Sequence, residues 1–219
     1  MKVSDASLSV VVPCRNAQPW LAEALESVLR QTVRPMEVIV VDDHSSDTSS
    51  ALARSLGSPV QVIASNGYGC NAARNTGMSA ARGEYVAMID ADDRVDPRKH
   101  ECQLRALENA DRWSIVHTGS TVFWSDASRP AVVRGGTEAA VGSCTRVIFE
   151  SNPVCGASVM MRREIVMELG NYDPEIAMSG DYAFSLVASA RCHFLCVPEP
   201  LYHIRRHAGN RTNRLNLKT

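Results

Sequence analysis

Apolar residues follow two alternating patterns along the first hundred positions. Short continuous apolar runs are typical of strands buried on both faces, and they alternate with segments whose apolar residues repeat at helical spacing. The predicted strands span 8–12, 38–41, 60–64 and 85–89, and the predicted helices span 20–31, 47–56 and 71–81. This order predicts an α/β fold with a mostly parallel central sheet flanked by helices, a Rossmann-like arrangement.

The second half of the chain is less regular. We expect helices to about Asn109, at 164–169 and at 182–190, and strands near 115–117 and 157–161. The polar stretch 125–142 has the composition of a mobile loop, and the basic tail 205–219 is expected to be loose. Because repeats and linkers are not evident, we predict one domain over 1–219, in which 111–219 elaborates the first half.

Composition narrows the classes of partner. The 23 Lys and Arg residues are matched by 24 acidic residues, a balance that argues against a nucleic-acid ligand. Seven cysteines without a CxxC pair favour buried reduced thiols over disulfides or structural zinc. No signal peptide or long apolar span is evident. We therefore expect a cytoplasmic protein without a transmembrane segment, which could contact a membrane peripherally.

Two acidic clusters follow predicted strands. Asp42 and Asp43 follow the second strand, and three aspartates at 90, 92 and 93 follow the fourth. Because carboxyl ends of parallel strands meet at one edge of a sheet, these clusters should lie close together and repel. A hard divalent cation would relieve the repulsion, with Asp92 as a direct ligand and with diphosphate oxygens and waters in the remaining positions. The alternative is that such residues cap turns and helices, and we assign that role to Asp47.

The ordered motifs of 8–97 resemble family 2 glycosyltransferases with the GT-A fold. Weaker agreement continues at 158–163, 170–173, 180–182 and 203–207. The strongest motifs are Ser9-Val10-Val11-Val12-Pro13, Glu37-Val38-Ile39-Val40-Val41-Asp42-Asp43, Ala73-Arg74-Asn75-Thr76-Gly77 and Asp90-Ala91-Asp92-Asp93. The resemblance implies a nucleotide-sugar-binding half at 1–110 and an acceptor-binding and catalytic half at 111–219.

Residue roles follow from that resemblance. The nucleotide sugar, with UDP favoured, would be bound by Pro13, Arg15, Asp43, Arg74, Asp90 and Ala91. Asp90 and Asp92 match the DxD pair, which implies that Asp92 binds Mn²⁺ or Mg²⁺, and His207 is a further candidate near the metal. Asp181 matches the general base, which takes the proton of an acceptor hydroxyl as its oxygen attacks the anomeric carbon. The implied outcome is inversion, and the acceptor could be a glycan or a lipid-linked glycan.

The chain also departs from the family pattern. Members often carry Glu before this aspartate, whereas Gly180 precedes Asp181 here, so a nucleotide-sugar-binding module without turnover is the alternative. Asp181 could instead cap a helix, and Arg74 could be a surface residue. A response-regulator receiver would need a lysine that the chain lacks between Lys99 and Lys218. The loops that follow the predicted strands match a phosphatase of the haloacid dehalogenase type or a nucleotidyltransferase less well than they match the glycosyltransferase family.

Overall fold

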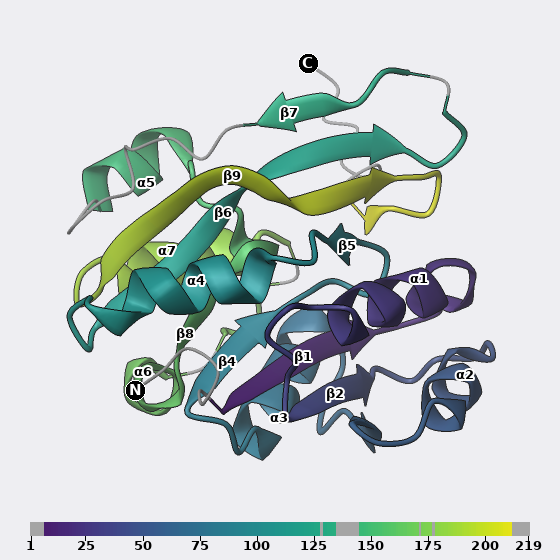
Figure 1. Ribbon diagram of the computed structural model, residues 1–219. Coiled ribbons are helices and arrows are strands. Elements are labelled where there is room, and N and C mark those ends of the chain that lie inside the picture. Colours follow the sequence, from purple (N-terminus) through teal and green to yellow (C-terminus); the bar gives the residue numbers. More distant parts are fainter. Residues whose placement is uncertain (1–6, 128, 135–144, 171, 177, 212–219) are drawn as a thin grey trace.

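The strands of the described residues form a single sheet, and helices pack against it (Figure 1). The computed structural model describes residues 7–127, 129–134, 145–170, 172–176 and 178–211. Within these ranges, nine strands pair in the order β3-β2-β1-β4-β8-β6-β9-β5, and β7 pairs with β6. The predicted α/β fold is confirmed, and its sheet combines strands from both halves of the sequence.

The first half supplies the parallel part of the sheet. The strands are β1 (Leu8–Cys14), β2 (Glu37–Asp42), β3 (Val60–Ala64) and β4 (Tyr85–Met88), which pair in parallel. The connecting helices are α1 (Gln18–Leu29), α2 (Ser49–Ser55) and α3 (Cys70–Ala80). A Cβ on Gly77 would lie 2.3 Å from Val11 Cγ1, so the glycine lets α3 pack directly on β1. The carboxyl ends of these strands share one edge.

The part of the chain that follows β4 adds mixed pairing. Its strands are β5 (Arg94–Val95), β6 (Ser114–Trp124), β7 (Val132–Arg134), β8 (Met160–Arg162) and β9 (His193–Arg206). Its helices are α4 (Lys99–Glu108), α5 (Thr145–Ser151), α6 (Arg163–Leu169) and α7 (Gly180–Ala188), with a 3₁₀ turn at Gly156–Ser158. Strand β8 runs antiparallel to β4 and β6, whereas β9 runs parallel to β6. The sheet is therefore parallel in its first half and mixed in its second.

Two apolar cores cover opposite faces of the sheet. Leu21 and Leu25 of α1 and Leu104 of α4 pack with Val10 on one face. Met78 of α3 and Phe184 of α7 pack with other strand residues on the other face. Continuous apolar runs fit this arrangement because helices bury both faces of each strand. None of the helices in the described ranges combines the length and the apolar composition that a membrane crossing requires.

Three expectations about segments are corrected. Strand β1 continues through Pro13, which lies beyond the last β1–β4 pair, where a missing N–H is tolerated. The polar stretch 125–142 contains strand β7, and residues 128 and 135–142 lie outside the described residues. The tail does not become loose at Arg205, because β9 extends to Arg206 and Arg205 is buried.

Candidate active site

The predicted site residues lie on loops and helix ends at the carboxyl edge of the parallel strands. Arg15 follows β1, Asp43 follows β2, and Arg74 lies on α3. The loop after β4 carries Asp90 and Asp92. Pro13 and Ala91 are buried, so a ligand would meet their backbone atoms rather than their side chains. The site therefore draws on four separate segments of the first half.

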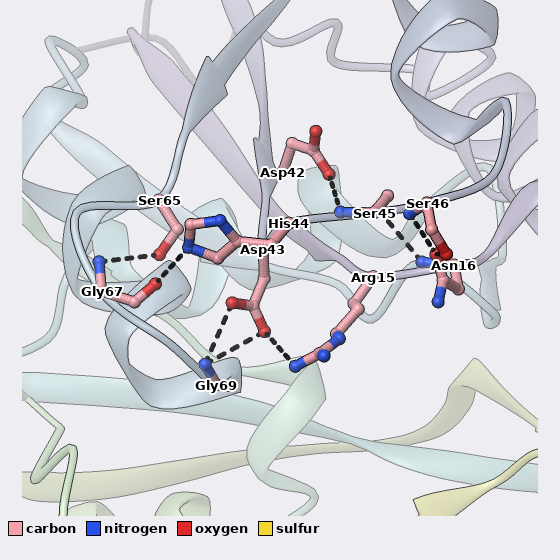
Figure 2. Close-up of polar contacts among 10 residues, drawn as sticks. All are labelled: Arg15, Asn16, Asp42, Asp43, His44, Ser45, Ser46, Ser65, Gly67 and Gly69. Atoms are coloured by element: carbon pink, nitrogen blue, oxygen red, sulfur yellow. Dashed lines mark hydrogen bonds and ion pairs between the residues drawn. The ribbon is translucent and has the colours of Figure 1, made fainter.

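Asp43 is the buried anchor of the first part of the site (Figure 2). Its carboxylate accepts the Gly69 N–H at 3.0 and 3.1 Å, and the Arg15 guanidinium lies 3.8 Å away. Gly69 has φ +91, a backbone conformation that side chains rarely adopt. Arg15 is largely exposed, so its guanidinium can contact both Asp43 and an anionic ligand.

Two left-handed residues shape the loops beside Asp43. Asn16 has φ 51 and His44 has φ 56. The Asn16 side chain accepts the Ser46 N–H at 2.8 Å, and its backbone N–H donates to Ser45 Oγ at 3.1 Å (Figure 2). His44 stacks on the exposed Tyr68 ring with 4.2 Å between centroids. Strained backbone of this kind persists where surrounding contacts fix it, and it is frequent at binding sites.

Asp42 differs from its neighbour Asp43. Its carboxylate accepts the Ser45 N–H at 3.0 Å and the Ser50 hydroxyl, so it holds the loop that follows β2. Asp47 likewise accepts backbone N–H groups of Ser49 and Gln18, so it serves the backbone as predicted, although the N-cap of α2 is Thr48. Of the aspartates after β2, Asp43 is thus the one directed toward Gly69 and Arg15.

Asp90 and Arg74 form an ion pair of 3.1 Å across the loop after β4. Arg74 is buried, with its guanidinium 5.3 Å from the Tyr172 ring centroid, so the alternative of a surface arginine is excluded. The Asp90 N–H donates to Tyr202 Oη at 3.0 Å. Burial raises the pKa of Asp90, the Arg74 charge opposes the rise, and the charges of Asp92 and Asp181 add to it.

Asp92 meets residues from the end of the chain. Its Oδ2 lies 3.0 Å from His207 Nε2 and 3.1 Å from Asn210 Nδ2. Arg205 Nε donates to the Asp92 carbonyl at 2.8 Å. The structure therefore brings together the two residues predicted near a metal, although 115 positions separate them in sequence.

The donor set can be compared with the needs of a divalent cation. Among the described residues, His, Cys, Asp and Glu side chains do not gather in threes as a ready-made cage. Mg²⁺ is usually held by one or two carboxylates together with waters and substrate phosphates. Asp92 with His207 nearby fits that partial donor set, and a cation there would reduce the repulsion among the aspartates of this loop.

Asp181 lies in the first turn of α7, half-buried beside the Arg74–Asp90 pair. The N-cap of this helix is Ser179, so Asp181 is not the capping residue. A Cβ on Gly156 would lie 2.6 Å from Asp181 Cβ, and this close approach fixes one side of the aspartate. The predicted base thus faces the same charged region as the predicted nucleotide site.

Several residues that hydrogen-bond to the predicted site residues were absent from the sequence prediction. They are Asn71, Tyr202, Arg205 and Asn210. Asn71 was the most accessible to prediction, because it lies one turn before Arg74. The three residues near the end of the chain carry no local signal that links them to a loop more than a hundred positions earlier.

Comparison with known proteins identifies a family. A model of the family described as Glycosyl transferase family 2 matches residues 9–170. The chain is 32% identical over 129 residues to the uncharacterized glycosyltransferase EpsJ of Bacillus subtilis, with 58% of this chain and 37% of that protein covered. It is 30% identical over 232 residues to the succinoglycan biosynthesis protein ExoO of Rhizobium meliloti, with 98% and 65% covered. The chain thus spans less than two thirds of these relatives.

Solved structures share the fold. The S. aureus TarS fragment 1–349 in complex with UDP superposes with a TM-score of 0.75 at 19% identity, covering 91% of this chain and 60% of that one. The same fragment in complex with UDP-GlcNAc gives a TM-score of 0.77 at 19% identity, covering 94% and 60%. At this level of identity the likeness establishes the GT-A fold.

Proposed function

The chain belongs to glycosyl transferase family 2, and on this premise we propose that it transfers a sugar from a nucleoside diphosphate sugar to a hydroxyl acceptor. The observation that carries the proposal is the gathering of Asp90 and Asp181 from separate segments around the buried Arg74 of α3, while Asp43 accepts the N–H of Gly69 at the start of the same helix. UDP and UDP-GlcNAc are bound in two solved TarS structures, which supports a uridine donor here.

The donor would lie along the carboxyl edge of the parallel strands. Asp43 and Arg15 would contact the base and ribose, since one offers acceptor oxygens and the other an exposed guanidinium. Asp90, held by Arg74, would lie near the ribose. Such charged groups orient a polar nucleotide and exclude alternative poses.

A divalent cation, Mn²⁺ or Mg²⁺, would be held by Asp92 with His207 nearby and by diphosphate oxygens. When bound, it would supply charge stabilisation for the departing diphosphate. Asp92 is suited to this role because Arg205 and Asn210 fix its backbone carbonyl and its Oδ2. Fixed ligand orientation is a general requirement of such sites.

Asp181 would be the general base. Its carboxylate accepts the proton of the acceptor hydroxyl while that oxygen forms a bond to the anomeric carbon and the bond to the diphosphate breaks. Attack from the face opposite the diphosphate inverts the anomeric configuration. The acceptor proposed is a glycan or a lipid-linked glycan in the cytoplasm, at or near a membrane surface.

The first test is a ligand panel read by thermal unfolding. UDP, UDP-glucose, UDP-GlcNAc and GDP-mannose are each added with Mn²⁺, Mg²⁺ or EDTA, and slow donor hydrolysis is then followed. Ligand at about 100 times its Kd should stabilise the fold by about 2.7 kcal/mol. We expect a metal-dependent rise in Tm with a uridine donor, which Asp92→Ala abolishes.

The outcomes separate the two candidate functions. Hydrolysis that is lost in Asp181→Asn supports the transferase. Binding without hydrolysis or transfer supports the module without turnover that Gly180 suggested. A Tm that no nucleotide changes, or a rise indifferent to metal and to Asp92, would overturn the proposed site.

A further inference from the structure

Asn71 joins the nucleotide side of the site to the segment that leads into α7. It lies in the first turn of α3 and is 6% exposed. Its Nδ2 donates to the carbonyls of Asp173 at 2.8 Å and Ile176 at 3.0 Å. A carboxamide has two N–H donors, and here both donate to backbone carbonyls that lie about a hundred residues away in sequence.

Asn75, one turn further along α3, contacts the same segment. Its Nδ2 donates to the Tyr172 carbonyl at 2.7 Å, and its Oδ1 accepts the Tyr172 N–H at 2.8 Å. The two amides together hold residues 172–176 against α3. This anchoring matters because the segment precedes the helix that carries Asp181.

Gly180 accommodates the Asn71 side chain. A Cβ at position 180 would lie 2.1 Å from Asn71 Nδ2 and 2.3 Å from Oδ1, whereas real Cβ atoms essentially never come closer than 3.0 Å to such an atom. Ser179, the preceding residue, has φ 59, a left-handed conformation that requires support from its surroundings. While the Asn71 carboxamide occupies this space, position 180 cannot carry even a Cβ atom.

Asn71 also contacts the nucleotide side of the site. Its Oδ1 lies 3.5 Å from Arg74 Nη1, and Arg74 pairs with Asp90. The Asn71 carboxamide therefore contacts Arg74 of the Arg74–Asp90 pair and the carbonyls of residues 173 and 176, and it fills the space beside Gly180.

We propose that Asn71 is the positioning residue for Asp181, and that it takes the space which a side chain at position 180 would otherwise fill. The inference rests on the proposed function, in which Asp181 is the general base. The absence of an acidic residue before Asp181 is then compensated, because the Asn71 carboxamide fixes the entry to α7 from the neighbouring helix. A role limited to packing would instead lower stability without a selective effect on turnover.

The test compares Asn71→Ala with Asn109→Ala, which removes an exposed carboxamide at the end of α4. Hydrolysis of UDP-GlcNAc and UDP-glucose and binding of UDP with Mn²⁺ are measured for each. Misplacing a catalytic group by about 1 Å can cost about 100-fold, so Asn71→Ala should lower kcat by about 10- to 100-fold. KM and the Kd of UDP should change little, and Asn109→Ala should match wild type.

Two double variants test the mechanism. In an Asp181→Asn background, Asn71→Ala should cause no further loss of the residual rate, because it acts through Asp181. Gly180→Ala alone should lower kcat and Tm, and it should cost far less in an Asn71→Ala background, where the clashing amide is gone. Gly180→Ala disturbs the same contact between positions 71 and 180 without removing the Asn71 side chain, so it remains informative if Asn71→Ala does not fold.

Three results would overturn the inference. They are an unchanged kcat in folded Asn71→Ala, additive losses with Asp181→Asn, and a cost of Gly180→Ala that does not depend on residue 71. Failure of the proposed function has a different signature, since full activity in Asp181→Asn, or no nucleotide binding by wild type, would remove the base or the donor site itself.

Discussion

Arg205 of β9 contacts the loop after β4 through both its backbone and its side chain. Its Nε donates to the Asp92 carbonyl, and its backbone N–H donates to Asp93 Oδ1 at 2.8 Å. The guanidinium also pairs with Glu23 and lies 4.7 Å from the ring centroids of both Trp20 and Phe123. A planar guanidinium suits this position because it stacks on rings and donates along its edge at the same time.

We predict that Arg205→Lys weakens metal-dependent nucleotide binding. Lysine keeps the charge but lacks the planar fork, so the Asp92 loop loses its fixed orientation. Loss of a residue that orients a metal ligand typically costs about 10- to 100-fold in metal affinity. Titration of Mn²⁺ at saturating UDP measures the change, with Arg30→Lys at the exposed C-cap of α1 as the control. An Mn²⁺ affinity equal to that of wild type would contradict this role.

At the scale of elements, α4 carries a buried cation. Lys99 is 1% exposed, and its Nζ donates to Gln103 Oε1 at 2.8 Å one turn along the helix. Burial lowers the pKa of Lys99 to about 7. Gln103 in turn donates to the carbonyls of Val116 and Ser158, so α4 is tied by polar bonds to β6 and to the 3₁₀ turn before β8.

This buried lysine predicts a pH-dependent stability. Between about pH 7 and the unfolded pKa of about 10.4, the unfolded chain holds one proton more than the folded chain at this site. Wild-type stability should therefore rise with pH by up to about 1.4 kcal/mol per unit relative to Lys99→Met. Urea unfolding at pH 7 and 9 measures the difference, and Arg98→Met removes a more exposed cation at the same helix end. A difference between Lys99→Met and wild type that is independent of pH would show that Lys99 stays charged in the fold.

The elements also show where sequence reasoning succeeds. Strands β1 to β4 and helices α1 to α3 were predictable because burial on both faces gives continuous apolar runs and helices give their own period. Strand β9 was missed because Pro198 and Pro200 interrupt its pattern. Its register to β6 shifts between Thr118 and Ser120, where Val197 and Tyr202 are the respective partners, so the prolines lie in an irregular stretch that needs fewer ladder bonds.

The same limit applies to the site. Asp43, Asp90 and Asp92 were predictable because Asp43 directly follows β2 and the other two lie in the short loop after β4, and position near a strand end is a local property of the sequence. The partners that fix them were not, since Asn71 acts on residues 173–176 and Tyr202 acts on Asp90 through contacts that only the folded sheet creates. Sequence patterns thus identified the charged groups, while their orientation depends on tertiary pairing.

At the scale of the whole molecule, the site joins the two halves of the chain. Strand β9 pairs with β6 and also with β5, the short strand that follows the Asp92 loop (Figure 1). Tyr202 and Arg205 contact that loop from the second half, while Arg74 contacts it from the first. A ligand that binds these loops should therefore stabilise segments that are distant in sequence.

We predict that UDP with Mn²⁺ slows amide hydrogen exchange at 66–74, 89–93 and 203–210. Local opening at these segments should become rarer because each contacts a proposed ligand-binding residue. Helix α6 serves as an internal reference, because it begins next to the first residue of β4, at the edge of the sheet opposite the site. With Asp92→Ala, which is expected to abolish metal-dependent binding, the protection should be lost at all three segments, including 203–210, where His207 lies 3.0 Å from Asp92. Protection confined to 66–74 in wild type would mean that the end of the chain takes no part in binding the donor, and that the contact between His207 and Asp92 is structural alone.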